Sequence, residues 1–112
     1  MRMWNVNPAV MCRQHLLGEH LEMHMFAGYI RCGRRLSGFI KNGLVEVERV
    51  KSRHDELAGE MCRRGYAHCS PLEVTPNGIF GGCVDPEKSR QELRTRCPVC
   101  KQLQEKAHDT NL

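Results

Sequence analysis

The sequence lacks long hydrophobic runs, any repeating period and any sign of an export signal. Its longest apolar runs are only a few residues, which excludes a membrane-spanning helix. The first segment, MRMWNVNPAVMCRQH, is interrupted by polar side chains before the apolar centre of a signal peptide could form. The missing period excludes collagen, coiled-coil and repeat architectures. We therefore expect a cytoplasmic protein with no membrane segment.

Several motifs of nucleotide and hydrolase chemistry are also missing. The sequence has no phosphate-binding loop, no nucleophile elbow and no dinucleotide fingerprint, which sets aside nucleotide-driven and serine-hydrolase reactions. A chain of 112 residues has room for one domain of ordinary small size. We expect a single domain over residues 1–112 and a monomer.

Cap signals and spacing predict three helices. Asn7 followed by Pro8 is typical of a cap and a first helical residue, which predicts a helix over residues 8–30. A second helix is expected within residues 44–65, where apolar residues share one face and Gly65 provides a left-handed cap. Asp85 and Pro86 repeat the cap signal and open a short third helix to about Arg96.

The remaining segments are rich in glycine and proline, or polar. Residues 31–43 and 69–83 are expected to be loops, and the tail after Cys100 is polar. The predicted fold is therefore all-α, a single compact domain of three main helices with long loops and no strand.

The seven cysteines are better interpreted as reduced thiols or metal ligands than as disulfides, because their number is odd and no export signal is present. Cys97-Pro-Val-Cys100 has the spacing of a metal chelate, and Cys69 and Cys83 could complete a tetrahedral zinc site. Alternatively, those two residues are ordinary thiols, which is also our expectation for Cys12, Cys32 and Cys62, buried or half-buried.

A second metal option is the pair His20 and His24, one helical turn apart in HLEMH. Glu22 lies two residues from each histidine, about 200° around the helix, whereas the base of a zinc protease must be one residue away. We therefore do not expect a metalloprotease.

Basic residues outnumber acidic ones, and they gather in runs. The totals are 17 Lys and Arg against 13 Asp and Glu, a formal charge of +4. The runs are Arg31, Arg34, Arg35 and Lys41; Arg63 and Arg64; and Arg90, Arg94 and Arg96. Such clusters attract a phosphate backbone, although a solvated surface would look the same in the sequence.

Three polar side chains share one face of the first helix. His15, Glu19 and Glu22 follow at i, i+4 and i+7, so they project together. They form either a site or an exposed charged face.

Two segments carry a resemblance to a known family. With RQHLLGEHLEMH on the first helix and SRHDELAGEMCRRGYAHCSPL closing the second, the chain resembles the pyrimidine-dimer DNA glycosylases, the phage endonuclease V type of ultraviolet-repair enzyme. The likeness covers about residues 1–72. Its most specific parts are Gln14-His15-Leu16, Glu19, Glu22 and Arg63-Arg64-Gly65-Tyr66. Residues 73–112, a loop, the third helix and the polar tail, show only a loose likeness.

The resemblance implies an all-α glycosylase whose nucleophile is the N-terminal α-amine, with a first-helix glutamate beside it. Here these groups are the amine of Met1 and the carboxylate of Glu22, because the bulky Arg2 would prevent removal of the initiator methionine. An ordinary α-amine has a pKa of about 7.8, so roughly one in seven is neutral at pH 7, against about one lysine in 2,500. The implied activity is base release followed by strand nicking as an AP lyase, with no cofactor.

The resemblance also implies a binding surface for double-stranded DNA. Gln14 and His15 would orient the nucleotide, Glu19 would lie at the same surface, and Arg2 would contact a phosphate, together with the basic runs at 31–41 and 63–64.

The family's phage member has arginines where this chain has Leu21 and Met25, and an aromatic-rich tail that this chain lacks. The substrate therefore stays open between a pyrimidine dimer, another lesion and a modified base, each reached by local opening of the duplex. Two alternatives are a non-catalytic DNA-binding protein and a zinc-stapled interaction module.

Overall fold

The structure is a computed structural model that describes residues 1–67, 70–75 and 77–110, with side chains described up to residue 107. Its helices are η1 (Pro8–Val10), α1 (Arg13–Arg31), α2 (Ser37–Lys41), η2 (Val47–Arg49), α3 (Val50–Arg63), α4 (Pro86–Arg96) and α5 (Pro98–Thr110), where η denotes a 3₁₀ helix. The described residues contain no strand. The predicted all-α class is therefore confirmed.

The first helix begins later than predicted. Asn7 does cap a helical turn, because its side chain accepts a hydrogen bond from the Ala9 amide, but that turn is the short η1. The chain is then extended at Met11 and Cys12, and the thiol of Cys12 caps α1 by accepting from the amide of His15. Cysteine is not among the usual capping residues, so this second start carries no familiar signal.

Two helices lie where loop and tail were predicted. The short α2 occupies part of the basic segment after α1, and α5 continues after Pro98. Proline at the first position of a helix loses no hydrogen bond, because the amide at that position has no partner within the helix. Pro98 thus begins α5 as readily as it ends α4.

The end of α3 follows its predicted cap. Gly65 has a φ of 80°, the left-handed conformation that glycine adopts without steric cost. Its amide donates to the carbonyl of Cys62, and the amide of Tyr66 donates to that of Met61. The helix therefore ends where the glycine signal indicates.

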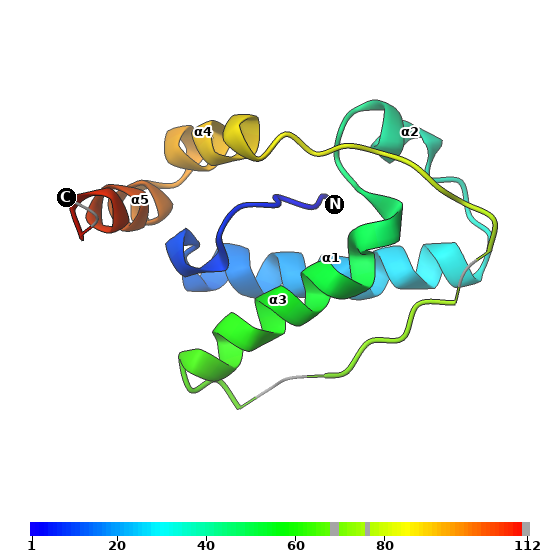
Figure 1. Ribbon diagram of the computed structural model, residues 1–112, viewed down its shortest axis with the longest axis horizontal. Helices are drawn as coiled ribbons and strands as arrows, with labels where there is room; N and C mark the ends of the chain where they lie inside the picture. The colour runs from blue at the N-terminus through cyan, green and yellow to red at the C-terminus, as the bar shows by residue number, and fades with distance from the viewer. Residues whose placement is uncertain (68–69, 76, 111–112) are drawn as a thin grey trace.

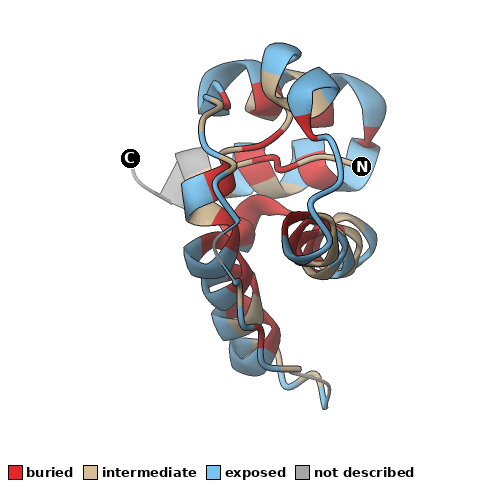
Figure 2. Ribbon diagram, turned by 90° about the vertical axis from the view of Figure 1, so that its right-hand side faces the viewer, coloured by how far each residue is buried: buried red, intermediate tan, exposed pale blue. Residues whose placement is uncertain are grey.

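The first six residues run between the helices. Helix α3 crosses α1, α4 and α5 form a second pair, and the N-terminus lies among these elements (Figure 1). Figure 2 shows buried residues on the inward sides of the helices and along this first segment. The core includes Met3, Trp4, Val6, Met11, Leu16, Met23, Phe26, Ile30, Val50, Leu57, Met61 and Leu93. The chain end is thus part of the interior.

A long connection brings the chain from α3 back to α4. Gly82 has a φ of 101°, and a Cβ at this position would lie 1.9 Å from the carbonyl oxygen of Val45. The backbone of Gly82 therefore passes too close to Val45 for any side chain at this position.

Among the described helices, none is long and apolar enough to cross a membrane.

Candidate active site

The N-terminal segment, defined here as residues 1–6, lies along one face of α1 in the opposite direction to the helix. The amide of Met3 donates to the carbonyl of Leu44 over 2.7 Å, and the amide of Trp4 donates to the carboxylate of Glu19. The indole of Trp4 meets the imidazole of His15 edge-on, with ring centroids 5.9 Å apart. These contacts hold the segment in a fixed register along the helix.

That register brings the α-amine of Met1 to the middle of α1. Its nitrogen lies 3.8 Å from Oε1 of Glu22. The Met1 side chain is 8% exposed and that of Glu22 is 28% exposed, so the pair lies at the edge of the core and solvent reaches the carboxylate. The expected proximity of these two groups is therefore present.

Glu19 lies in the interior, whereas the sequence predicts it at the DNA surface. Its two carboxylate oxygens accept from Nε and Nη2 of Arg53 over 2.6 and 2.8 Å. Both side chains are at most 1% exposed. Burial raises the pKa of Glu19, against the opposing effect of the guanidinium. A buried carboxylate with this partner supports the fold and cannot touch DNA directly.

Arg2 contacts α4. Its guanidinium donates to Glu92 over 2.7 Å and to Ser89 over 3.1 Å, and it stacks 3.8 Å from the ring centroid of Trp4. These contacts occupy the side chain, which is 16% exposed. Arg2 therefore ties the N-terminal segment to α4 and leaves little of its guanidinium for a phosphate.

A cleft of about 340 Å³ opens beside Arg2. Lys41 and Lys88 line it with Arg2, and the acidic residues at its wall are Asp85 and Glu92. The cleft adjoins the N-terminal segment through Arg2, and its two lysines place cationic groups in its wall.

Gln14 and His15, both predicted to orient a nucleotide, have different surroundings. Gln14 is exposed on the first turn of α1. Nδ1 of His15 lies 3.1 Å from Sγ of Cys12 and 3.7 Å from Sγ of Cys100. His15 precedes Glu22 by seven residues, about 10.5 Å along the helix axis. Its imidazole thus belongs to a thiol cluster two turns away from the amine.

The basic residues of the segment 31–41 are exposed. Arg31, Arg34, Arg35 and Lys41 lie at the end of α1, in the following loop and on α2. Arg34 stacks over Tyr29, 5.2 Å from the ring centroid. Within the described part of the chain, none of the four forms an ion pair. Their charges are therefore available to an anionic partner.

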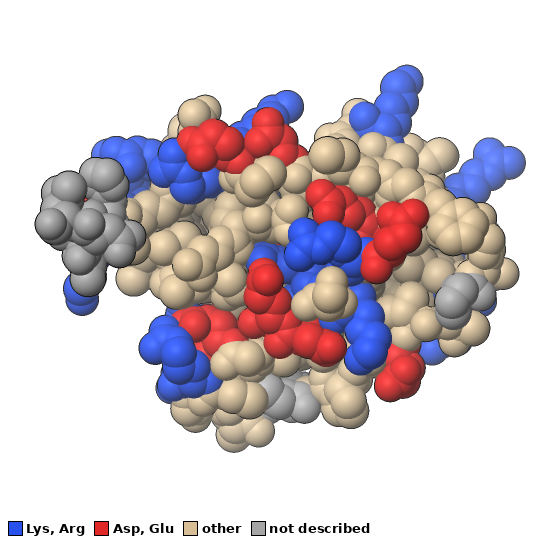
Figure 3. Space-filling view, viewed as in Figure 1, with Lys and Arg blue, Asp and Glu red and all other residues tan. Residues whose placement is uncertain are grey.

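The charges over α2 differ from those over η2 and α3 (Figure 3). Acidic and basic side chains are mixed near the centre of the face, over η2 and α3, whereas basic side chains project without acidic neighbours over α2. Of the basic runs predicted from the sequence, the one within residues 31–41 therefore lies around α2, at one end of the molecule.

Arg63 and Arg64, predicted as phosphate contacts, both pair with Glu60. Arg64 is mostly buried and donates to Glu60 over 2.7 Å and to the carbonyls of Met11 and Pro8 over 2.7 and 3.1 Å. Arg63 is 66% exposed. Arg64 therefore holds η1 against the end of α3, and only Arg63 presents a solvent-facing guanidinium.

Three of the cysteines meet at the junction of α1, α4 and α5. Cys12, Cys97 and Cys100 are buried and lie with His15 so that their possible ligand atoms are all within 4.8 Å of one another. Burial raises the pKa of the Cys100 thiol to about 12. For Cys97, burial acts in the same direction, but hydrogen bonds from the Cys100 amide and the neighbouring thiols outweigh it and lower the pKa.

The partners of Cys97 and Cys100 thus differ from the predicted set. Cys83 is exposed and is not in this group, and Cys69 lies outside the described residues. Cys32 and Cys62 are exposed as well, so of the three cysteines expected to be buried only Cys12 is. The spacing Cys12-x2-His15 is a chelate signal that sequence reasoning missed.

A histidine cluster lies on the other side of α1. His20, His24 and His54 have ring centroids 4.6–5.0 Å apart, and the first two line a cleft of about 840 Å³ with Arg13 and Tyr66. Both nitrogens of His54 are already engaged, Nδ1 with Asp55 and Nε2 with the carbonyl of Ser70. The cluster is therefore a poorer metal site than the thiol group.

One comparison with known proteins gave a match, to a family model. The family model for pyrimidine dimer DNA glycosylase matches residues 1–74, which include the N-terminal segment, α1 and α3. A search of curated proteins and of solved structures found no match. Because the matched region spans well over half of the chain and carries both Met1 and Glu22, the protein belongs to the pyrimidine dimer DNA glycosylase family.

Proposed function

We propose that this protein is a DNA glycosylase with AP lyase activity that removes a pyrimidine dimer or another damaged base from double-stranded DNA, with the α-amine of Met1 as nucleophile. The single observation that supports it best is the 3.8 Å distance between that amine and the Glu22 carboxylate. Chain ends usually fray, so an amine held by the core next to a carboxylate is unusual.

Base release begins when the amine lone pair attacks C1′ of the damaged nucleotide. A carbon–nitrogen bond forms, the glycosidic bond breaks, and the base leaves with the bonding electrons and takes up a proton. The amine then loses a proton as the C1′–O4′ bond opens and O4′ is protonated, which leaves an imine. The carboxylate of Glu22 stabilises the positive charge on the sugar and accepts the amine proton.

Strand nicking follows from the imine. A proton leaves C2′, its electrons form a carbon–carbon double bond, and the C3′–O bond breaks with release of the 3′ phosphate. Water then hydrolyses the imine and restores the amine. Glu22 accepts the C2′ proton in this proposal, because its carboxylate lies beside the Met1 nitrogen to which C1′ is bonded.

The basic surface supplies the contacts to the DNA backbone in this proposal. Arg31, Arg34, Arg35 and Lys41 are exposed and cationic, and Lys41 also reaches the cleft beside Arg2. Arg63 and Gln14 add exposed polar groups, whereas Arg2 and Arg64 position the segment and η1. The damaged nucleotide has to leave the stack to bring C1′ to the amine.

The test is covalent trapping with borohydride on duplexes that carry a cyclobutane dimer or an abasic site. The hydride reduces the imine to a stable amine, so the native protein should form an adduct that peptide mapping places on Met1. The intact mass of the protein establishes that Met1 is the first residue. Acetylating the amine, or adding one residue before it, should reduce the adduct about a hundredfold or more, because lysine amines are far less often neutral. Equal trapping with a blocked terminus would move the nucleophile to a lysine such as Lys41 or Lys51.

Glu22→Gln tests the carboxylate in the same assay. Glutamine keeps the shape but loses the charge and basicity, so we expect both steps to slow by about 10²–10⁴-fold while duplex affinity is retained. Glu73→Gln, an exposed glutamate in the connection before α4, is the matched control. Wild-type rates in the Glu22 variant would remove it from the mechanism. A native protein that binds duplexes but traps no abasic site would instead be a non-catalytic DNA-binding protein.

A further inference from the structure

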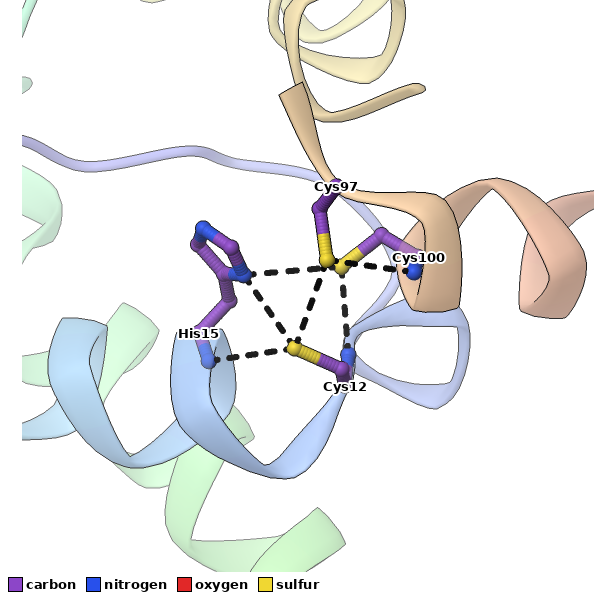
Figure 4. A group of neighbouring side chains, drawn as sticks. All are labelled: Cys12, His15, Cys97 and Cys100. Atoms are coloured by element: carbon purple, nitrogen blue, oxygen red, sulfur yellow. Dashed lines mark hydrogen bonds between the residues drawn. The ribbon is translucent and has the colours of Figure 1, made fainter. Parts of the chain in front are cut away.

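The thiol cluster lies apart from the proposed catalytic pair and is built from two distant segments. Cys12 and His15 come from the cap and first turn of α1, and Cys97 and Cys100 come from the junction of α4 and α5. Each half has the spacing of a two-residue chelate, Cys-x2-His and Cys-x2-Cys. Figure 4 shows the four side chains pointing toward one another.

Their separations match the edges of a zinc tetrahedron. With zinc–sulfur bonds of about 2.3 Å and zinc–nitrogen bonds of about 2.0 Å, sulfur–sulfur edges are about 3.8 Å and sulfur–nitrogen edges about 3.5 Å. In the structure, Sγ of Cys12 and Sγ of Cys97 are 3.8 Å apart. Nδ1 of His15 is 3.1 Å from Sγ of Cys12 and 3.7 Å from Sγ of Cys100. The four ligand atoms therefore enclose a space of the right size.

The backbone around the cluster is arranged for thiolates. Each sulfur accepts one amide hydrogen bond: Cys100 Sγ from the Cys12 amide over 3.3 Å, Cys97 Sγ from the Cys100 amide over 3.4 Å, and Cys12 Sγ from the His15 amide over 3.5 Å. Amide donors stabilise sulfur that carries negative charge, as the outer contacts of metal ligands do. The same amides would therefore stabilise the charge of the three sulfurs when these bind a metal ion.

A disulfide is a poor alternative for the Cys12 and Cys97 pair. A disulfide bond is about 2.05 Å long, well short of the 3.8 Å between these two sulfurs. Three thiols and one imidazole are the soft ligands that zinc prefers, and four protein ligands leave no open position for catalysis.

We propose that Cys12, His15, Cys97 and Cys100 bind one structural Zn²⁺ ion. The ion joins the start of α1 to the α4–α5 pair, which lies beyond the residues that the family model covers. His15 is then a metal ligand and makes no contact with the nucleotide. Because only Met11 separates η1 from Cys12, the site also fixes the chain close to the segment that carries the Met1 amine.

Metal analysis of the full chain, purified without a tag and without added metal, tests this site. We expect one zinc per chain, and cobalt reconstitution should give the absorption of a tetrahedral thiolate complex. Cys97→Ser and Cys100→Ser should lose the zinc, whereas Cys83→Ser and Cys32→Ser, which change exposed cysteines, should keep it. Metal-free native protein, or zinc retained by Cys97→Ser, would overturn the proposal. Zinc lost from Cys83→Ser would instead favour the set that includes Cys69 and Cys83.

A measurement on the unaltered chain covers the case in which the variants do not fold. Thiol titration without denaturant should show Cys12, Cys97 and Cys100 protected, and a strong chelator should expose them and lower the melting temperature. A melting temperature that stays unchanged after complete zinc removal would contradict the site. These readouts do not depend on DNA cleavage, so the zinc proposal and the proposed activity fail separately.

Discussion

Glu19 and Glu22 are the same residue type one helical turn apart, yet their surroundings give them different chemistry. Glu22 is partly open to solvent and faces an amine, which suits a group that must exchange protons. Glu19 is closed off by Arg53 and the Trp4 amide, which suits a group that must stay in place. The N-terminal segment is the element that separates the two roles, because it covers Glu19 and ends at Glu22.

Glu19→Gln should destabilise the fold more than it affects chemistry. Among the described residues, the change leaves the fully buried Arg53 with only the half-exposed Glu56 as an ionic partner. We expect the free energy of unfolding to fall by about 3–5 kcal/mol, because a buried charge that loses its buried partner is costly. Denaturant unfolding measures this loss, with Glu73→Gln as control. The double variant Glu19→Gln, Arg53→Met should recover much of the loss, and a single variant as stable as the native protein would contradict the role of the pair.

Glu60 makes part of the stability depend on pH. Hydrogen bonds from Arg63 lower the pKa of this carboxyl most, burial opposes them, and Arg64 lowers the pKa further. A depressed folded-state pKa gives stabilisation that is complete above the unfolded value, about 4.3 for glutamate, and is lost as pH falls through the folded value. Glu60→Gln should therefore cost about 1–2 kcal/mol at pH 7 and progressively less below about pH 4. Unfolding at a series of pH values checks this, and a pH-independent difference would contradict it.

At the scale of helices, the sequence predicted those boundaries and faces that depend on neighbouring residues. The Gly65 cap, the Asp85–Pro86 start of α4 and the apolar face of α3 follow from neighbours in the sequence, and the structure has them. The start of α1 depends on a thiol cap, and α5 begins at a proline that equally well ends a helix. Those two boundaries are set by packing between distant segments, which spacing alone does not reveal.

The site residues, too, depend on contacts between distant segments, which spacing alone does not reveal. The proximity of Met1 and Glu22 came from the family resemblance, since no periodicity predicts where a chain end lies. The burial of Glu19 depends on Arg53, 34 residues away. Arg53 stands in the apolar stripe of α3, three residues after Val50, and a cation in such a stripe is the signal that could have identified the pair.

For the whole molecule, the exposed cations at one end predict how DNA affinity depends on salt. Arg34→Ala with Arg35→Ala should lower the slope of log affinity against log salt by up to about 1.8, because each phosphate contact contributes about 0.9. Lys101→Ala, an exposed residue on α5, is the matched control and should leave the slope unchanged. Titration of a labelled duplex at several salt concentrations measures both. An unaltered slope in the arginine variant would place the DNA elsewhere on the surface.

The contacts of Arg2 have a consequence for how the chain folds. Arg2 bonds to Glu92, ninety positions along the chain, and Cys12 meets Cys97 across eighty-five. Loops of that length close late, because their entropy is lost before any contact compensates it. The first residues to be synthesised therefore make these contacts only after the last helices have been synthesised. We expect the amine to reach Glu22 only in the final stage of folding, so that a nascent or truncated chain would hold its nucleophile unaligned until the last helices have docked.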